Sequence, residues 1–414
     1  MMARVAEIGE CVEVVSGPAF KSAKFSDDPS DVPLIKGENV GQGYIAWEKS
    51  KYWPVNDIEG YERFSLSSGD IVLAMDRPWV TAGLKWARLR PYDPPSLLVQ
   101  RVARLRAKSG LHQDYLTYVV ASASFSEYVR NTMGGTNVPH ISGAQIKAFK
   151  FRLPGENEQV AIAATLSAYD DLIGNNRRRI ALLEEAARLL YREWFVHLRF
   201  PGHEHVKIID GLPEGWERKQ IAELAEIFRG RSYSSQELVD EGGQPFVNLK
   251  CIQRFGGFRV SGLKGFRGEH KDHHLLAPGG IVIAVTDMTR EAMIVAQAAR
   301  IPRTVGEEAI YSMDLVKAVP KDGVDLSWFY GLLRFSRFSA EVREEATGAT
   351  VLHLKPKHIE AWTATVPSAL LRGLFSEQLG AILDQIDNLE LQDEKLAQAR
   401  DLLLPRLMNG EIAV

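Results

Sequence analysis

The chain contains two long stretches in which apolar residues recur at alternating intervals of four and three positions. The first series runs Ile162, Leu166, Tyr169, Ile173, Ile180, Leu183, Ala187, Leu190 and Trp194, with Asn176 in the same register. This spacing predicts the seam of a coiled coil, and the Pro-Gly pairs at 154–155 and 201–202 bracket a helix over 154–200. At about 1.5 Å per residue such a helix is roughly 60 Å long. It is too long for one small domain and needs a partner helix.

The second series supplies that partner. It consists of Phe375, Leu379, Ile382, Ile386, Leu389, Leu396, Leu403 and Leu407, within a predicted helix over 370–410 that Gly410 caps. Asp393 and Arg400 interrupt the apolar series, as Asn176 does in the first helix. A polar residue in such a seam usually fixes the register of the two helices, so we interpret these residues as structural and not as catalytic.

The chain is an approximate duplication. At a constant offset of 213 residues Val138 meets Val351, His140 meets His353, Pro154 meets Pro367 and Leu190 meets Leu403. The match weakens upstream, where VPLIKGENV from Val32 resembles QPFVNLKCI from Gln244. So long a period excludes short solenoid repeats and indicates two copies of one unit, a strand-rich module followed by a helix.

The strand-rich modules cover 1–153 and 211–369. Short apolar runs between Gly and Pro turns predict strands at Ile71 to Ala74, Leu97 to Val102, Gly280 to Val285 and Leu315 to Val319. One helical stretch is expected in each module, Gln113 to Arg130 and Leu326 to Glu345. The predicted fold class is α+β: two globular α/β domains separated by two long helices, with an internal pseudo-two-fold repeat.

The amino-acid composition indicates the number of domains and the cellular location that we expect. The 414 residues, 45% hydrophobic and 25% charged, are typical of a folded protein of two to three domains. Cys11 and Cys251 are the only cysteines, and their isolation speaks against a disulfide framework or a structural zinc site. The chain has no basic leader with an apolar core and no apolar run of about 18 residues. We therefore expect a cytoplasmic protein without a membrane partner.

The charge is unevenly distributed. Although the net charge is only −3, eight Lys or Arg lie between Arg77 and Lys108 beside Asp76 and Asp93, and six lie between Lys250 and His274 against two acids. The region from Arg372 to Glu411 has eight acids and four bases. The two basic runs are interpreted either as solvated faces or as separate nucleic-acid contacts.

The same glycine-rich turn recurs in both modules, as GGTNVPHIS after Met133 and TGATVLHLK after Ala346. Such turns can bring backbone N–H groups and small polar side chains against phosphates or base edges. The alternative is a purely structural turn between helix and strand, and recurrence favours a shared structural role with DNA contact added.

Motifs for catalysis are weak. The segment Tyr92-Asp93-Pro94-Pro95-Ser96 resembles the D-P-P-aromatic loop of amino-methyltransferases, but Ser96 takes the place of the aromatic residue and no glycine-rich cofactor loop precedes it. His270, His273 and His274 lack a Cys partner and are expected in a polar loop. The sequence has no phosphate-binding loop, no G-x-S-x-G and no H-E-x-x-H motif. We predict a non-catalytic chain with no cofactor or metal of its own.

Six segments together resemble the specificity subunits of type I restriction-modification systems. They are QRVARLR from Gln100, TNVPHIS from Thr136, FRLPGENEQVAIAATLSAYDDLI from Phe151, GLPEGWE from Gly211, TGATVLHLK from Thr347 and LLLPRLMNGEI from Leu402. Their order along nearly the whole chain makes the resemblance specific. This sequence departs from the pattern at Leu352, which replaces the Pro139 of the first copy.

The resemblance implies two target-recognition domains, each reading half of a bipartite site in double-stranded DNA, held apart by an antiparallel pair of helices. It also implies that two methyltransferase subunits dock on the helices and that restriction and translocase subunits associate through them. Adenine methylation with S-adenosylmethionine, and any use of ATP and Mg, then belong to those partners. Two readers on a rigid rod would recognise half-sites at a set separation, about 34 Å for one turn of DNA.

The candidate DNA-binding residues are cations, amides and turn residues of the two modules. They are Lys36, Asn39, Arg77, Lys85, Thr136 and His140 in the first module, and Arg229, Arg231, Asn248, Lys250, Arg290, Thr350 and His353 in the second. Two other functions remain open: a DNA methyltransferase or nuclease that acts alone, and a coiled-coil scaffold without DNA specificity.

Overall fold

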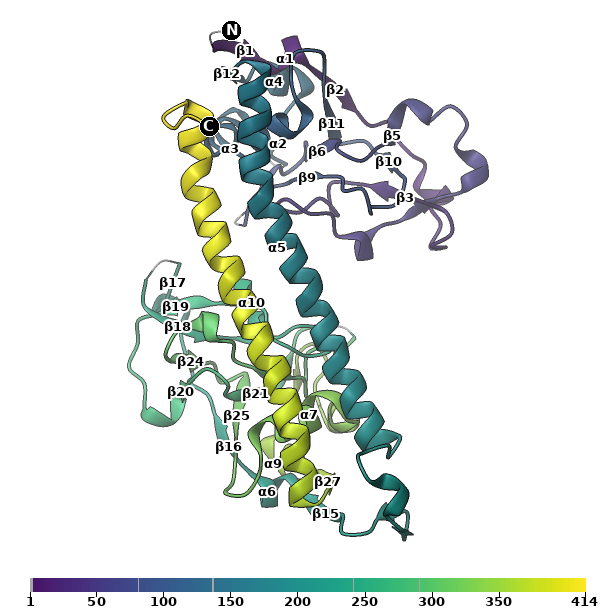
Figure 1. Ribbon diagram of the computed structural model, residues 1–414, viewed down its shortest axis with the longest axis vertical. Helices are drawn as coiled ribbons and strands as arrows, with labels where there is room; N and C mark the ends of the chain where they lie inside the picture. The colour runs from purple at the N-terminus through teal and green to yellow at the C-terminus, as the bar shows by residue number, and fades with distance from the viewer. Residues whose placement is uncertain (1–2, 81, 136–137, 241, 290) are drawn as a thin grey trace. The chain divides into compact units, whose positions relative to one another are not determined.

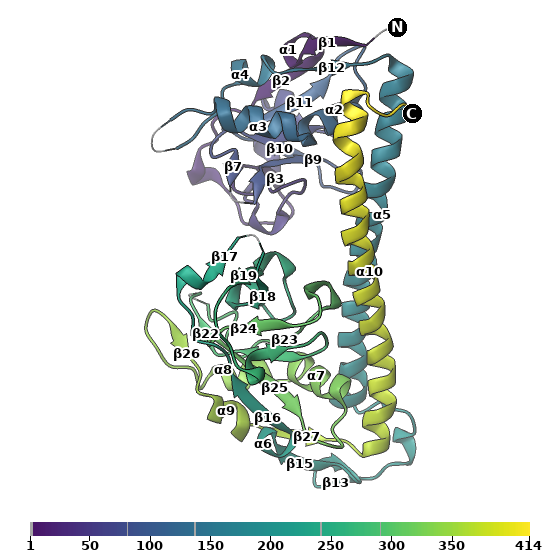
Figure 2. The same cartoon turned by 90° about the vertical axis from the view of Figure 1, so that its left-hand side faces the viewer.

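The structure is a computed structural model and describes residues 3–80, 82–135, 138–240, 242–289 and 291–414. The chain forms two compact units, unit 1 with residues 1–172 and 396–414, and unit 2 with residues 173–395. Each unit contains a mixed α/β domain and parts of two long helices, which Figures 1 and 2 show from two sides. Within the described ranges, no helix combines the length and apolar character that a membrane span requires.

Both predicted long helices form. Helix α5 spans Glu156–Tyr191 and continues into a π-helical turn at Arg192–Val196, and helix α10 spans Ala369–Asn409. Every position of the predicted α5 seam is buried or half-buried. Gly410 follows α10 with a positive φ of 76°, as expected of a C-cap glycine.

In unit 1, α5 and α10 are antiparallel. Ile162 of α5 lies in one core with Leu407 of α10. Two turns further along α5, Asp170 Oδ1 accepts a hydrogen bond at 2.7 Å from the Arg400 guanidinium, which lies two turns earlier in α10. The other oxygen of Asp170 accepts from the Tyr118 hydroxyl at 2.8 Å, which ties the helix pair to the α/β domain.

The helices are antiparallel in unit 2 as well. Asn176 Nδ2 of α5 donates to Asp393 Oδ1 of α10 at 2.9 Å. Further along α5, the Tyr191 ring lies edge-on to the Phe375 ring near the start of α10, with ring centroids 5.9 Å apart. The polar residues that interrupt the second seam, Asp393 and Arg400, therefore each meet a polar residue of the first helix.

The duplication is visible first in a pair of short strands. β1 (Arg4–Glu7) pairs antiparallel with β12 (Lys150–Leu153), and β15 (Glu217–Gln220) pairs antiparallel with β27 (Thr363–Val366). Each pair brings together the start of an α/β domain and the strand that leads into a long helix. Both strands of the second pair lie 213 residues after their counterparts, as the sequence offset requires.

The main sheet of each unit has four antiparallel strands in the same order. In unit 1 the order is β2 (Val12–Ser16), β11 (Val102–Ala107), β6 (Ile71–Ala74) and β9 (Trp86–Arg88). In unit 2 it is β16 (Ala225–Arg229), β25 (Leu315–Pro320), β21 (Ile281–Ala284) and β23 (Ala298–Arg300). The central strands β6 and β21 are buried throughout, which explains their continuous apolar runs.

A second sheet shows that the duplication extends into the region of weak sequence match. Its order is β4 (Tyr52–Trp53), β3 (Val32–Ile35), β10 (Ser96–Leu98) and β5 (Ser65–Leu66) in unit 1. In unit 2 it is β17 (Leu238–Val239), β19 (Lys264–Phe266), β18 (Gln244–Val247), β24 (Ala309–Tyr311) and β20 (Leu275–Leu276). The parallel pairs β3–β10 and β18–β24 correspond.

The helical stretch predicted in each domain is two helices. Unit 1 has α2 (Gln113–Ala121) and α3 (Ala123–Thr132), and unit 2 has α7 (Leu326–Phe335) and α8 (Phe338–Arg343). Ser122 separates α2 from α3, because its hydroxyl caps α3 by accepting from the Phe125 amide at 3.2 Å. The short helices α4 (Gly143–Lys147) and α9 (Pro356–Ala361) follow the recurrent turns.

The compact units divide the chain inside the long helices, whereas the domain boundaries suggested by the sequence, 153/154 and 369/370, lie at the helix starts. The reason is packing: Ile162, Ala163 and Leu166 of α5 share a core with β1, β6 and α2 of unit 1. The α/β domain of unit 1 and the adjoining helix segments therefore share one hydrophobic core.

Candidate nucleic-acid interface

The recurrent glycine-rich turns have a clear structural cause. Gly135 has a φ of 109° and Gly348 a φ of 139°. A Cβ on Gly135 would lie 2.6 Å from the Val138 carbonyl oxygen, and one on Gly348 would lie still closer to the Val351 oxygen. Only glycine fits either position. The two turns therefore follow the same backbone path, which requires glycine in both units.

In unit 1 this turn meets the end of strand β6. His140 Nδ1 lies 2.6 Å from Asp76 Oδ1, and Arg101 Nε lies 3.5 Å from Asp76 Oδ2. Arg77 and Arg101 both have left-handed backbones, with φ of 44° and 68°. Both side chains are exposed. The candidates Arg77 and His140 are thus brought together beside Asp76.

Lys85 completes a basic cluster with Arg77 and Arg101. Its backbone amide donates to the Pro78 carbonyl at 2.7 Å, and its ammonium donates to the Gly37 carbonyl. Burial lowers the pKa of Lys85, and the nearby positive charges of Lys49 and Arg77 lower it further. We call Arg77, Lys85 and Arg101 the unit 1 cluster.

Two other unit 1 candidates, Asn39 and Lys36, make contacts within their own domain. Asn39 is 1% exposed, and its side chain donates to the Leu34 carbonyl and the Ser50 hydroxyl and accepts from the Lys36 amide. The Lys36 ammonium pairs with Glu38 and lies 5.4 Å from the Phe25 ring centroid. The Asn39 side chain is therefore not accessible to DNA. The positive charge of Lys36 is partly compensated by Glu38.

The unit 2 candidates divide in the same way. Asn248 is 8% exposed and caps a short 3-10 helix by accepting from the Lys250 amide, and Arg231 pairs with Glu237 and donates to the Glu269 carbonyl at 2.8 Å. Arg229 and Lys250 are exposed, and no described residue pairs with their charged groups.

The remaining candidates belong to the recurrent turns or lie outside the described residues. Thr350 and His353 are exposed in the unit 2 turn, where the His353 amide donates to the Thr347 carbonyl at 2.8 Å. Thr136 and Arg290 lie outside the described residues. Arg101 belongs to the basic run but is not among the predicted site residues, because its left-handed backbone beside Asp76 cannot be read from the sequence.

The D-P-P segment is a structural turn. Asp93 accepts from the Arg90 amide at 2.6 Å and from the Trp47 indole at 3.0 Å, so its carboxylate is engaged within the fold. Ser96 is 3% exposed in strand β10. This geometry differs from an open loop that receives a flipped base. Within the described ranges, no three His, Cys, Asp or Glu side chains are grouped as metal ligands.

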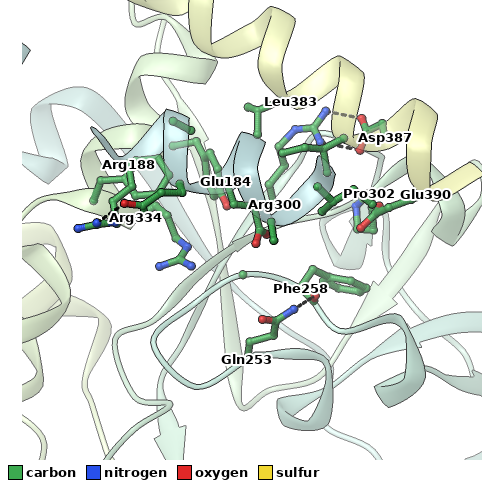
Figure 3. A pocket seen from close by; sticks show the side chains of 18 residues that line it. Glu184, Arg188, Gln253, Phe258, Arg300, Pro302, Arg334, Leu383, Asp387 and Glu390 are labelled. Atoms are coloured by element: carbon green, nitrogen blue, oxygen red, sulfur yellow. Dashed lines mark hydrogen bonds and ion pairs between the residues drawn. The ribbon is translucent and has the colours of Figure 1, made fainter. Parts of the chain in front are cut away.

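Unit 2 contains a pocket of about 380 Å³ where α5 and α10 meet β23 and α7. Figure 3 shows Arg300 reaching Asp387 of α10, with hydrogen bonds of 2.9 and 2.8 Å to its two oxygens. Burial raises the pKa of nearby Glu390 to about 7, and the negative charge of Asp387 adds to the effect. The ion pair fastens the α/β domain to the helix, so we interpret the pocket as a structural junction.

Comparisons with known proteins agree with this architecture. Residues 3–185 match the family model described as the type I restriction modification DNA specificity domain. The MjaIX specificity subunit of Methanocaldococcus jannaschii is 26% identical over 440 residues, which cover 95% of this chain and 96% of the relative. The MjaVIII specificity subunit of the same organism is 34% identical over 185 residues, 44% of this chain and 43% of that one.

A solved structure shares the fold. The type I restriction-modification S subunit from M. genitalium superposes with a TM-score of 0.58 at 16% identity, covering 98% of this chain and 96% of that one. Two α/β domains joined to shared helices define a specificity-subunit fold. The chain is therefore similar over nearly its whole length to type I restriction-modification specificity subunits, and its residues 3–185 match their DNA specificity domain.

Proposed function

We propose that this chain reads a bipartite site in double-stranded DNA, with one half-site read by each unit, and does no chemistry itself. The observation that carries the proposal is the duplication: both units have a main sheet with the same strand order, a second sheet with a corresponding parallel strand pair, the same recurrent turn and the same attachment to an antiparallel helix pair. A protein with two equivalent reading units suits a target with two half-sites.

Exposed cations supply the first contacts with DNA. Arg229 and Lys250 present positive charge that is suited to phosphates, while the exposed Arg77 and Arg101 and neighbouring polar groups can reach base edges in the major groove. His353 and Thr350 lie on the exposed turn of unit 2, where backbone amides and small side chains are close to the surface. Binding through these groups should weaken steeply with added salt.

We further propose that two methyltransferase subunits dock on the helices, one in each unit. Leu189 of α5 is 43% exposed and Leu402 of α10 is 71% exposed, and the two residues are equivalent at the 213-residue offset. Exposed leucines at equivalent helix positions favour two equal apolar docking sites. Restriction and translocase subunits would join through the methyltransferases, with S-adenosylmethionine, ATP and Mg held by these partners in the cytoplasm.

The experiment is to co-express the chain with methyltransferase subunits encoded beside it and to map methylated adenines across the host genome. The proposal predicts methylation at one split motif with an invariant spacer, only when both proteins are present. Methylation by the chain alone, together with binding of S-adenosylmethionine to the purified chain, would support a stand-alone methyltransferase. Scattered or absent methylation would support the scaffold alternative.

A further inference from the structure

Backbone hydrogen bonds show which loop positions of the two units correspond. In unit 1 the Met75 amide donates to the Arg101 carbonyl at 2.8 Å, and in unit 2 the Val285 amide donates to the Asp314 carbonyl at 2.8 Å. Arg101 and Asp314 each immediately precede the equivalent strands β11 and β25. They occupy the same place in the fold with opposite charge.

A second correspondence concerns Lys85. The Ala74 amide at the end of β6 donates to the Lys85 carbonyl at 3.0 Å, and the Ala284 amide at the end of β21 donates to the Gln297 carbonyl at 3.0 Å. Lys85 therefore corresponds to Gln297, which is uncharged and 7% exposed.

A third correspondence concerns Arg77. Its amide donates to the Pro139 carbonyl at 2.7 Å. In unit 2 the residue paired with Leu352, the equivalent of Pro139, is Asp287. The three cations of the unit 1 cluster thus correspond to two aspartates and a glutamine. The two units therefore share backbone hydrogen bonds at these positions but differ in the charge of the side chains.

Asp287, the residue that corresponds to Arg77, has a structural role in unit 2. Asp287 is 1% exposed and accepts hydrogen bonds from the amides of Thr289, Ile294 and Val295. Arg77 has no such role, since its exposed guanidinium has no partner among the described residues. A non-glycine residue with a φ of 44° costs on the order of 1 kcal/mol. Such strain, kept on an exposed arginine, indicates a functional position.

The carboxylate of the neighbouring Asp76 favours a DNA base over a phosphate as the ligand of Arg77 and Arg101. Its carboxylate is held by His140 and lies 3.5 Å from Arg101 Nε. A carboxylate here repels a phosphate, whereas it orients a guanidinium without blocking its outer donors. The planar donors of arginine match O6 and N7 of guanine in the major groove.

We propose that Arg77 and Arg101 read guanine in the half-site recognised by unit 1, and that unit 2 reads its half-site without an equivalent arginine at these positions. The inference rests on the proposed DNA-reading function. It identifies two specificity-determining residues and predicts that the two half-sites respond differently to their loss.

The test compares methylation maps of the co-expressed complex carrying Arg77→Gly or Arg101→Gly. Glycine adopts both left-handed backbones without strain, so each variant should keep the fold while losing the guanidinium. We expect the preference for guanine at one position of one half-site to fall by about tenfold or more, with the other half-site unchanged. Lys150→Ala is the control, since it removes one exposed positive charge from β12 of the same unit. It should leave the motif intact.

An unchanged motif in both glycine variants would overturn the proposal. So would a uniform drop at all sites with the motif preserved, because that pattern indicates phosphate contact. If a variant gives too little methylation to map, the purified complex can select from duplexes randomised in both half-sites, with the same outcomes. Failure of the unmodified complex to methylate any split motif would instead refute the underlying DNA-reading function.

Discussion

The Asn176 side chain of α5 donates a hydrogen bond of 2.9 Å to the Asp393 carboxylate of α10 in the middle of an apolar seam. Asn176 is 5% exposed, and burial raises the pKa of Asp393 while the hydrogen bond from Asn176 lowers it. A pair of this kind opposes sliding of the helices, because any other register leaves the amide or the carboxylate without its partner. The polar pair Asn176–Asp393 therefore fixes the register of α5 and α10.

Replacing one member of this pair should destabilise the protein. We expect Asp393→Leu to lower the free energy of unfolding by about 1–3 kcal/mol, since it leaves the Asn176 amide unsatisfied. The double variant Asn176→Leu with Asp393→Leu should recover that loss or exceed the original stability. Urea denaturation of the two single variants and the double variant measures the coupling. Strictly additive losses would contradict the assignment of this pair as a register lock.

The Glu390 carboxyl predicts a pH dependence of stability. Its pKa of about 7 lies above the usual 4.5, so the folded state holds a proton that the unfolded state releases. The stability contributed by protonated Glu390 is therefore present below about pH 4.5 and lost as the pH rises to about 7. Glu390→Gln should flatten this slope and stabilise the protein at pH 8, by about 1–3 kcal/mol at most. Denaturation at several pH values measures both slopes, and equal slopes would refute the assignment.

The recurrent glycine turn predicts a position-specific cost of adding one methyl group. Gly135→Ala combines a left-handed backbone with a contact of 2.6 Å to the Val138 oxygen, so it should destabilise by several kcal/mol. Gly60→Ala is the matched control, because Gly60 has a φ of 88° but nothing within 4 Å of the added Cβ. That change should cost only about 1 kcal/mol. Thermal unfolding compares them, and equal losses would show that the close approach is unimportant.

The sequence predicted the features that depend on periodicity and repetition. The seam positions from Ile162 to Trp194, the cap at Gly410 and the duplication all follow from spacing, and the structure confirms each. The sequence does not predict the helix break at Ser122, because a serine that caps a helix cannot be distinguished by residue type from a serine inside a helix.

The candidate site was harder to predict because side-chain availability depends on tertiary contacts. Asn39 and Asn248 have residue types suited to base contact, yet both are buried and hydrogen-bonded within loops. Conversely, Arg101 is a candidate site residue because of its left-handed backbone and its contact with Asp76, which is distant in sequence. Neither property follows from local patterns.

The most direct test of the duplicated-reader account is to replace residues 225–362 by a second copy of residues 12–149. The graft joins at equivalent points, since β1 and β12 of unit 1 correspond to β15 and β27 of unit 2 at the 213-residue offset. Because the helices are antiparallel, two identical readers should produce a methylated motif with inverted copies of one half-site. Methylation at the original two different half-sites, or at a motif with no symmetry, would contradict the account.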